Sequence, residues 1–178
     1  FSLIPFAEYV NVGVGNRNKS WISVPPDSTG TWTYSPVTSS TNCRTQTMTG
    51  YNDGVPYTYQ GQVCDNTYGS PVTVSYPITW QGCVGSRNSP LDSQDGSYTA
   101  RIPGLMDNEV WCPGPIIPLT SNSSVVTTAI DGLAAGGETY IPAGLLWGWL
   151  TLSPGEPFAE TNKGVISDNN LRRFIVLM

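Results

Sequence analysis

Residues 136–155, GGETYIPAGLLWGWLTLSPG, decide how the last third of the chain folds. Two glycines end the preceding element, and Pro142 stands where a first-turn proline removes no helical hydrogen bond, so a helix is predicted over 142–152. The Ser-Pro-Gly that follows ends this helix. Trp147 and Trp149 lie on different sides of it. We expect at least one of these rings to pack on the sheet and the other to meet the surface or the inserted residues 16–114.

The composition excludes several classes of function. The chain has 178 residues, the size of one domain, with 8 basic and 13 acidic side chains and no histidine. The few basic residues are scattered, so a nucleic-acid partner is not expected. Without histidine, Ser-His-Asp and Cys-His nucleophiles and His-based zinc sites are excluded. The 19 glycines and 15 prolines predict loop-rich β structure, and no apolar run is long enough for a membrane span.

Four widely spaced cysteines predict two disulfides. Three pairings exist, and we favour the sequence neighbours, Cys43 with Cys64 and Cys83 with Cys112, because each bond would staple a stretch poor in regular structure. Free buried thiols are the alternative. Disulfides place the protein in an oxidising compartment: the periplasm, the cell surface or the extracellular space.

Three zones follow one another along the chain. Residues 1–15 are apolar and β-rich, and residues 16–114 are dominated by Ser, Thr, Gly, Tyr, Pro and Asn, which predicts short strands and long loops. Residues 115–178 return to α/β structure. There we expect a strand in GPIIPLT, a helix over 123–134 that Ser121 or Asn122 caps, the tryptophan-rich helix, and a buried strand in the final RRFIVLM.

Two groups of oxygen-bearing side chains are candidates for chemistry. Thr139 follows the glycine pair, where its hydroxyl could reach a hard cation at the edge of a sheet; alternatively it only caps the helix that begins at Pro142. The carboxylates of PLDSQD and MDNEV could flank a sugar as acid and base, although these segments are equally typical of turns or calcium loops. They are Asp92, Asp95, Asp107 and Glu109.

Five segments together resemble the bacterial TadG-like pilus-assembly proteins: LIPFAEYVNVG, TWQGCVGSRNSPLD, CPGPIIPLTSN, GGETYIPAGLLWGWLTLSPGEPF and RRFIVLM. The resemblance covers nearly the whole chain. It implies part of a von Willebrand factor A domain, an α/β domain with a Rossmann-like sheet, formed by residues 1–15 and 115–178. Residues 16–114 would be a large disulfide-stapled β-rich insertion. The resemblance also implies that FSLIPF and GPIIPL pair antiparallel and that the chain is a piece of a longer protein.

The resemblance further implies a magnesium site. In that family the A domain binds Mg²⁺ at a metal-ion-dependent adhesion site, through a DxSxS motif after the first strand, a threonine in the glycine loop and an aspartate directly after a strand like FIVLM. Only Thr139 matches a ligand position; the other two would lie before Phe1 and after Met178. Glu138 stands where the family is expected to have glycine, and Leu150 where a basic residue is common. Mg²⁺ is therefore expected in the full-length protein, and no tight binding in this chain.

The implied function is non-enzymatic: adhesion or pilus assembly at the cell envelope, through contacts with other pilus components or with the rest of its own chain. Open strand edges in an incomplete sheet predict self-association. Besides Thr139, the candidate binding residues are Glu138, Trp147 and Trp149. The second hypothesis is a secreted carbohydrate-binding or glycosidase-like β domain, in which aromatic side chains form a recognition surface rather than a core. These are Trp21, Trp32, Tyr34, Tyr51, Tyr57, Tyr59, Tyr68, Tyr76, Trp80, Tyr98 and Trp111.

Overall fold

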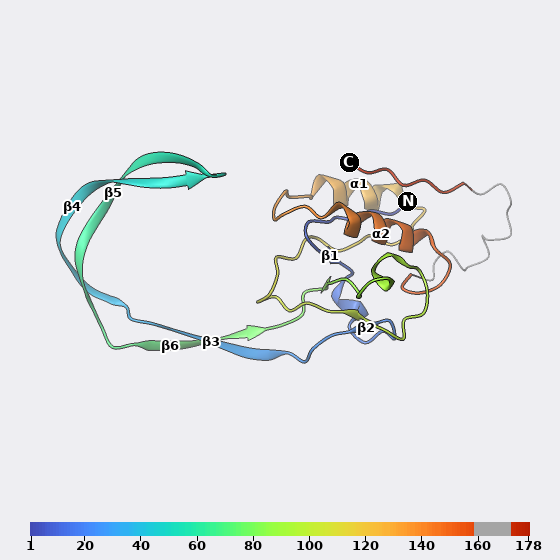
Figure 1. The fold of residues 1–178 in the computed structure, drawn as a ribbon, viewed down its shortest axis with the longest axis horizontal. Coiled ribbons are helices and arrows are strands. Elements are labelled where there is room, and N and C mark those ends of the chain that lie inside the picture. Colours follow the sequence, from blue (N-terminus) through green and yellow to red (C-terminus); the bar gives the residue numbers. More distant parts are fainter. Residues whose placement is uncertain (159–171) are drawn as a thin grey trace. The chain divides into compact units, whose positions relative to one another are not determined.

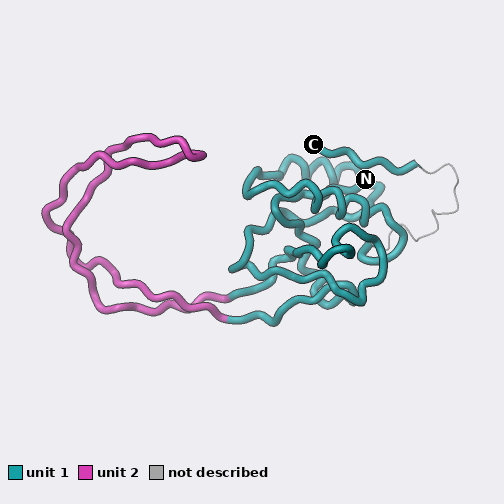
Figure 2. The backbone as a smooth tube through the Cα atoms, viewed as in Figure 1, with its two compact units in different colours: residues 1–28, 78–178 teal, residues 29–77 magenta. Residues whose placement is uncertain are grey.

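The computed structural model describes residues 1–158 and 172–178 of the chain, which fall into two compact units (Figure 2). Unit 1 comprises residues 1–28 and 78–178, and unit 2 comprises residues 29–77. Unit 2 lies within the segment that the sequence predicts to be an insertion. The remainder of that segment folds with the two ends of the chain in unit 1.

Unit 1 contains two short strand pairs and two single-turn 3-10 helices (Figure 1). The first pair is antiparallel and the second is parallel. The strands are β1 (Val10–Asn11) with β7 (Cys83–Val84), and β2 (Ile22–Ser23) with β8 (Ile102–Pro103); the 3-10 helices are η1 (Val14–Asn16) and η2 (Leu91–Ser93). An isolated antiparallel bridge joins Leu3 to Ile117, which confirms the predicted pairing of FSLIPF with GPIIPL.

Both predicted helices are present, and local rules explain their ends. α1 (Ser123–Asp131) begins where the Asn122 side chain accepts a hydrogen bond of 3.1 Å from the Ser124 N–H, and it ends at Gly132, earlier than predicted. α2 (Ile141–Leu152) carries proline in its first turn and ends at Ser153. α1 has no buried residue, whereas α2 buries one side.

Aromatic and β-branched residues from all parts of unit 1 form one core. Trp21 lies at its centre, and its ring approaches those of Trp147 and Phe158, with centroids 6.2 Å and 6.4 Å away. The other buried members come from the short strands, the loops and α2. They are Val10, Val12, Ile22, Trp80, Val84, Ile102, Met106, Ile116 and Leu150. This core holds the segments between the short strands in place.

Unit 2 is built from two two-stranded ribbons, of which the second is the longer and is antiparallel. β3 (Ser28–Tyr34) pairs with β6 (Val72–Ile78), and β4 (Val37–Asn52) pairs with β5 (Val55–Tyr68). An Asp-Gly turn closes the second ribbon, with positive φ angles of 48° at Asp53 and 78° at Gly54, as a type I′ hairpin turn requires. No residue of β4 or β5 is buried.

Cross-strand contacts and a disulfide support the long ribbon. Tyr57 lies over Gly50, where a Cβ atom would stand 2.7 Å from the ring, and Met48 lies over Gly61 in the same way. The register shifts between Thr41 and Arg44, where β4 has one residue more than β5. The disulfide Cys43–Cys64 crosses the ribbon at this bulge.

The predicted α/β fold, a partial von Willebrand A domain with a Rossmann-like sheet, is wrong. Each of the four sheets in the described residues has only two strands. Strands, and not helices, make up most of the regular structure there. A Rossmann-like sheet needs a strand between successive helices. Residues 132–140 lead from α1 to α2 without forming one. The predicted buried strand RRFIVLM forms no regular secondary structure and is exposed.

Candidate functional site

A pocket of about 430 Å³ lies in unit 1, beside the loop that contains the glycine pair. α2 contributes Ala143, Leu146, Trp147 and Leu150 to its lining, and β8 contributes Ile102. The lining also includes polar side chains from three separate segments: Glu8, Tyr9, Ser86, Arg87, Asp92, Glu138, Thr139 and Tyr140. The pocket thus combines an apolar wall with several charged groups, as ligand pockets commonly do.

The glycine pair lets the loop approach an aromatic ring. Gly137 has a φ angle of 75°, which glycine adopts without strain. A Cβ atom added at Gly137 would stand 3.0 Å from the Trp111 ring, and one added at Gly136 would stand 3.1 Å from it. A side chain at either position would therefore push the ring away. The Tyr140 N–H donates to the Ala7 carbonyl over 2.9 Å, which fixes the other end of the loop against the beginning of the chain.

Three of the four predicted binding residues meet at this pocket. Glu138, Thr139 and Trp147 line it, and Trp149 does not. Trp147 is 3% exposed and Trp149 is 43% exposed, which confirms that the two rings lie on different sides of α2. Thr139 does not cap the helix, because the N-cap residue is Tyr140 and no side chain bonds the free N–H groups there.

The charges around the pocket are mainly acidic. Glu8, Asp92 and Glu138 line it together with one cation, Arg87. Arg87 as a whole residue is 8% exposed. Its guanidinium donates to the carbonyls of Gln94, over 2.6 Å, and Ser97, over 3.3 Å. Arg87 therefore fixes the loop that follows η2. The Tyr9 hydroxyl donates to Glu8 over 2.9 Å, and this bond raises the pKa of Tyr9.

Tyr98 is the most perturbed titratable group among the described residues. Its ring lies under the Arg87 guanidinium, 4.8 Å from the ring centroid, and its hydroxyl is buried without a hydrogen-bond partner. Burial, with a further contribution from the negative charge of Asp95, raises the pKa of Tyr98 to about 12. This tyrosine stays neutral at physiological pH and supports the pocket wall through Arg87.

The described residues do not assemble a magnesium site. Thr139 shares the pocket with Glu8 and Glu138, but no three Asp, Glu or Cys side chains converge within residues 1–158 and 172–178. Glu8 is already bonded to Tyr9. Mg²⁺ needs six oxygens in near-octahedral arrangement, so this set does not fit the ion that the resemblance implies.

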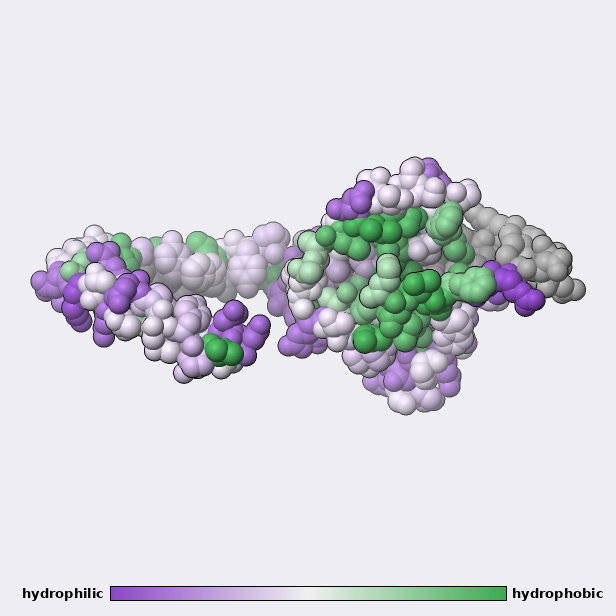
Figure 3. All heavy atoms as spheres, turned by 90° about the horizontal axis from the view of Figure 1, so that it is seen from above, coloured by the Kyte–Doolittle hydropathy of each residue, from purple (hydrophilic) through white to green (hydrophobic). Residues whose placement is uncertain are grey.

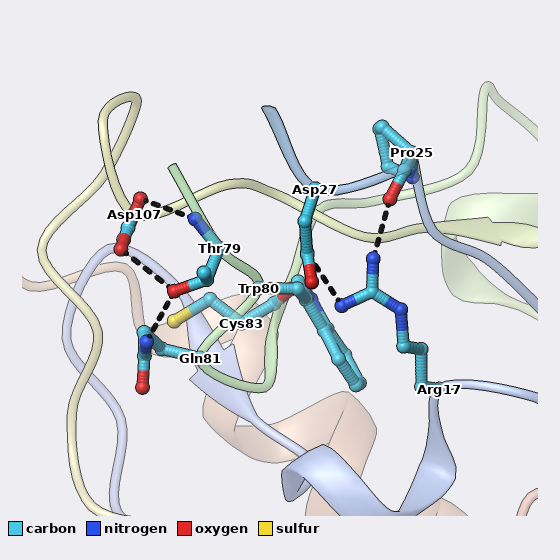
Figure 4. A network of polar contacts seen from close by, with 8 residues as sticks. All are labelled: Arg17, Pro25, Asp27, Thr79, Trp80, Gln81, Cys83 and Asp107. Carbon is cyan, nitrogen blue, oxygen red and sulfur yellow. Dashed lines mark hydrogen bonds and ion pairs between the residues drawn. The ribbon is translucent and has the colours of Figure 1, made fainter. Parts of the chain in front are cut away.

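Two of the four carboxylates proposed for acid-base chemistry, Asp107 and Glu109, accept hydrogen bonds from the backbone. Asp107 accepts hydrogen bonds from the Thr79 N–H and hydroxyl, over 3.0 Å and 3.1 Å (Figure 4). Glu109 accepts from the Met106 N–H over 3.0 Å. Asp107 thus joins two segments that are distant in the sequence, whereas Glu109 closes its own turn. Asp92 lines the pocket, and Asp95 acts on Tyr98.

Both favoured disulfides are present. Cys43 bonds Cys64 in unit 2, and Cys83 bonds Cys112 in unit 1. The second bond ties β7 to the residue after Trp111, which packs on the glycine loop. It therefore links the core to the segment that packs on the glycine loop.

The aromatic side chains divide between core and surface. Trp21 and Trp80 are buried, and Trp80 donates its indole N–H to the Cys83 carbonyl over 2.7 Å (Figure 4). The other members of the predicted recognition surface, apart from the partly buried Tyr98, are exposed by 38% or more. They are Trp32, Tyr34, Tyr51, Tyr57, Tyr59, Tyr68, Tyr76 and Trp111.

Sequence reasoning missed five polar residues of the pocket: Glu8, Tyr9, Ser86, Arg87 and Tyr140. Glu8 and Tyr9 lie in an apolar opening segment, and Arg87 is a single cation in a stretch of small polar residues. No shared motif connects these positions. Only the folding of distant segments around α2 brings them together.

Comparison of the chain with protein families, with curated proteins and with solved structures finds no match in any of the three. Among the helices of the described residues, neither is long and apolar enough to cross a membrane.

Proposed function

We propose that this protein acts without catalysis, through protein-protein contacts outside the cytoplasm, in adhesion or in the assembly of a surface structure such as a pilus. The observation that carries the proposal is the exposed side of α2. Its sequence, IPAGLLWGWLTL, contains no charged residue. A helix that is apolar on all sides is normally buried on all sides.

Unit 1 covers only one side of α2. Trp147 and Leu150 face the core, whereas Ile141, Leu145 and Trp149 are 47%, 41% and 43% exposed. These three residues are spaced by four and form one line along the helix, here called the α2 stripe. Figure 3 shows apolar residues gathered on one face of unit 1. Contiguous apolar surface of this kind marks sites of protein contact.

Further observations support the setting and the absence of catalysis. The two disulfides are typical of oxidising compartments. The carboxylates of Asp107 and Glu109 already accept hydrogen bonds from the backbone N–H groups of Thr79 and Met106. The pilus role comes from the resemblance to TadG-like proteins and remains part of the proposal.

Site-specific photo-crosslinking in cells tests the proposal. A photoreactive amino acid at Leu145 or Trp149 should give discrete crosslinks to partner proteins, because these side chains project from the α2 stripe. The same amino acid at the exposed Lys19, far from α2 in sequence, is the control. Equal crosslinking from position 19, or none from positions 145 and 149, would contradict the proposed role.

Carbohydrate binding is a second candidate, favoured by a specific arrangement in unit 2. Trp32 and Tyr34 stack with ring centroids 4.8 Å apart and planes inclined by 18°, and both are exposed. Residues 29–77 contain only three charged side chains, Arg44, Asp53 and Asp65. A flat aromatic surface among hydroxyl groups with little charge suits a neutral, polyhydroxylated ligand.

A glycan array separates this candidate from the first. Glycan binding that is lost in Trp32→Ala and kept in Trp149→Ala would favour carbohydrate recognition by unit 2. Absence of glycan binding, together with crosslinks from the α2 stripe, would favour the protein-contact role.

A further inference from the structure

The long ribbon of unit 2 has two outer edges without a partner strand among the described residues. β4 and β5 form a two-stranded sheet, and neither strand pairs with a third. A two-stranded hairpin by itself is at best marginally stable in water, whereas three or more strands with an apolar face are stable. The ribbon therefore has the form of a sheet that lacks its remaining strands.

The register shows which backbone groups of β4 point outward. Asn52 pairs with Val55 around the two-residue turn, and such a flanking pair exchanges both backbone hydrogen bonds. Because the pairs alternate along an antiparallel ladder, residues 45, 47, 49 and 51 direct their N–H and C=O groups away from β5. Pro56 agrees with this alternation, since it pairs with Tyr51 and has no N–H to offer the ladder.

The two edges differ in their protection. Proteins shield edge strands with charges, prolines and bulges. The β5 edge carries Pro56, and the bulge of β4 lies before Arg44. Residues 45–51 of β4, TQTMTGY, contain no charge, no proline and no bulge. This segment is the open edge of the ribbon.

We propose that residues 45–51 of β4 pair antiparallel with the same residues of a second copy of this chain, about a two-fold axis at Met48. In this register Thr47 lies opposite Thr49 of the second copy, and Thr45 lies opposite Tyr51. These are the outward-facing positions, so the register joins donors to acceptors on both strands. The result is a four-stranded sheet with β4 of each copy at its centre.

The faces of the ribbon match in the same register. Met48, Val55, Tyr57 and Tyr59 share one face of the β4–β5 ribbon, as their pairing and the contacts of Met48 and Tyr57 with glycines show. The two-fold axis places the Met48 side chains of the two copies side by side on this face. The apolar surfaces of both ribbons then become continuous. The other face carries Thr47 and Gln60, which are hydrogen-bonded over 3.0 Å.

The charges near the β4 edge also permit pairing with a second copy. Arg44 and Asp65 pair with each other at 3.7 Å, beside the bulge and outside the open edge. No like charges therefore oppose one another across the two-fold axis. The proposal does not depend on the α2 stripe, which lies in unit 1.

Charge exchange across the two-fold axis tests both the pairing and its register. Light scattering of the full chain should show a concentration-dependent dimer. Thr47→Lys/Thr49→Lys places lysines opposite each other twice and should raise the dissociation constant about tenfold or more, leaving the 19.2 kDa of one chain as the main species. Thr47→Lys/Thr49→Glu places opposite charges across the same pairs and should restore the dimer.

A matched control adds the same charges to the other strand. Thr58→Lys/Gln60→Lys removes the Gln60–Thr47 hydrogen bond as the edge variants do, but it leaves the β4 edge unchanged, so the dimer should persist. Hydrogen exchange supplies a second readout: the amides of Thr47 and Thr49 should be protected in the dimer and exchange faster on dilution. A monomeric wild type, failure of the lysine-glutamate variant to restore the dimer, or loss of the dimer in Leu145→Asp would each overturn the proposal.

Discussion

The indole of Trp21 meets the indole of Trp147 edge to face at the centre of unit 1, with ring centroids 6.2 Å apart and planes inclined by 61°. Phe158 completes the cluster, 6.1 Å from Trp147. One aromatic contact therefore fastens the beginning of the chain to α2 and to the residues that follow it. Trp149, two positions further on, takes no part in this cluster and is exposed.

Truncation should affect the two α2 tryptophans very differently. Trp147→Ala removes a ring that is 3% exposed and should lower the free energy of unfolding by about 3–5 kcal/mol. Trp149→Ala removes a ring that is 43% exposed and should cost less than about 1 kcal/mol. Denaturant unfolding followed by circular dichroism measures both. Equal losses in the two variants would contradict the assignment of Trp147 to the core.

The two disulfides should stabilise different parts of the protein. Cys83→Ser/Cys112→Ser opens a loop with a sequence separation of 29 in unit 1 and should destabilise that unit by about 3–4 kcal/mol. Cys43→Ser/Cys64→Ser opens a loop with a sequence separation of 21 in unit 2 and should leave the free energy of unfolding of unit 1 unchanged. Near-ultraviolet circular dichroism and hydrogen exchange distinguish the units. A single loss shared by both variants would contradict the separation into two units.

Tyr98 should make the protein less stable in strong alkali. Its folded pKa of about 12 lies above the usual tyrosine value of 10.0, so burial favours the neutral form. The stabilisation is fully present below pH 10 and is lost as the pH rises toward 12, because the unfolded chain releases this proton first. After discounting for the partial exposure of the ring, the loss amounts to about 1–2 kcal/mol.

Tyr98→Phe provides the control for this pH dependence. The Tyr98 hydroxyl has no hydrogen-bond partner, so its removal should change the stability little at pH 7. Above pH 11 the variant should be more stable than the wild type, since phenylalanine does not titrate. Parallel stability curves for the two proteins between pH 9 and pH 12 would show that Tyr98 is not perturbed.

Asn11 should be among the costliest polar side chains to remove. Its amide donates to the Pro113 carbonyl and accepts from the Gly13 N–H, each over 2.8 Å, and the residue is 7% exposed. Asn11→Ala leaves both backbone groups without this partner and should cost about 2–4 kcal/mol. Asn16→Ala loses one partly buried bond of 2.7 Å to the Val12 carbonyl and should cost about 1 kcal/mol. Thermal unfolding of both variants measures the difference.

The helices and the disulfides could be predicted because their causes are local. The Asn122 side chain caps α1 by accepting from an N–H group only two residues further on. Pro142 favours the start of α2 from within its first turn. The pairing of Cys43 with Cys64 joins sequence neighbours among the cysteines. Such signals are complete within a short stretch of sequence.

Strands were predicted in residues 16–114, but most of their partners were not, because the partner of a strand is not encoded within the strand itself. The β4–β5 register depends on the Asp53-Gly54 turn and on Tyr57 lying over Gly50. Residues 174–178 have the composition of a buried strand, yet Phe174 is 81% exposed.

Some residues of the candidate pocket could be predicted and others could not, because only some of them are neighbours in the sequence. Glu138, Thr139 and Trp147 stand close together in sequence around the glycine pair, so the local motif indicated them. Glu8 and Arg87 reach the same pocket from distant segments, and their positions depend on the packing of the core.

The Cys43–Cys64 bond also determines how unit 2 would respond to tension. A pull applied to residues 29 and 77 passes from Cys43 to Cys64 through the covalent sulfur bridge, and residues 44–63 carry no load. Twenty extended residues span about 70 Å, so this length is withheld from any stretching of the chain until the bridge is reduced. The tip of the hairpin keeps its shape under forces that would unzip an unbridged ribbon.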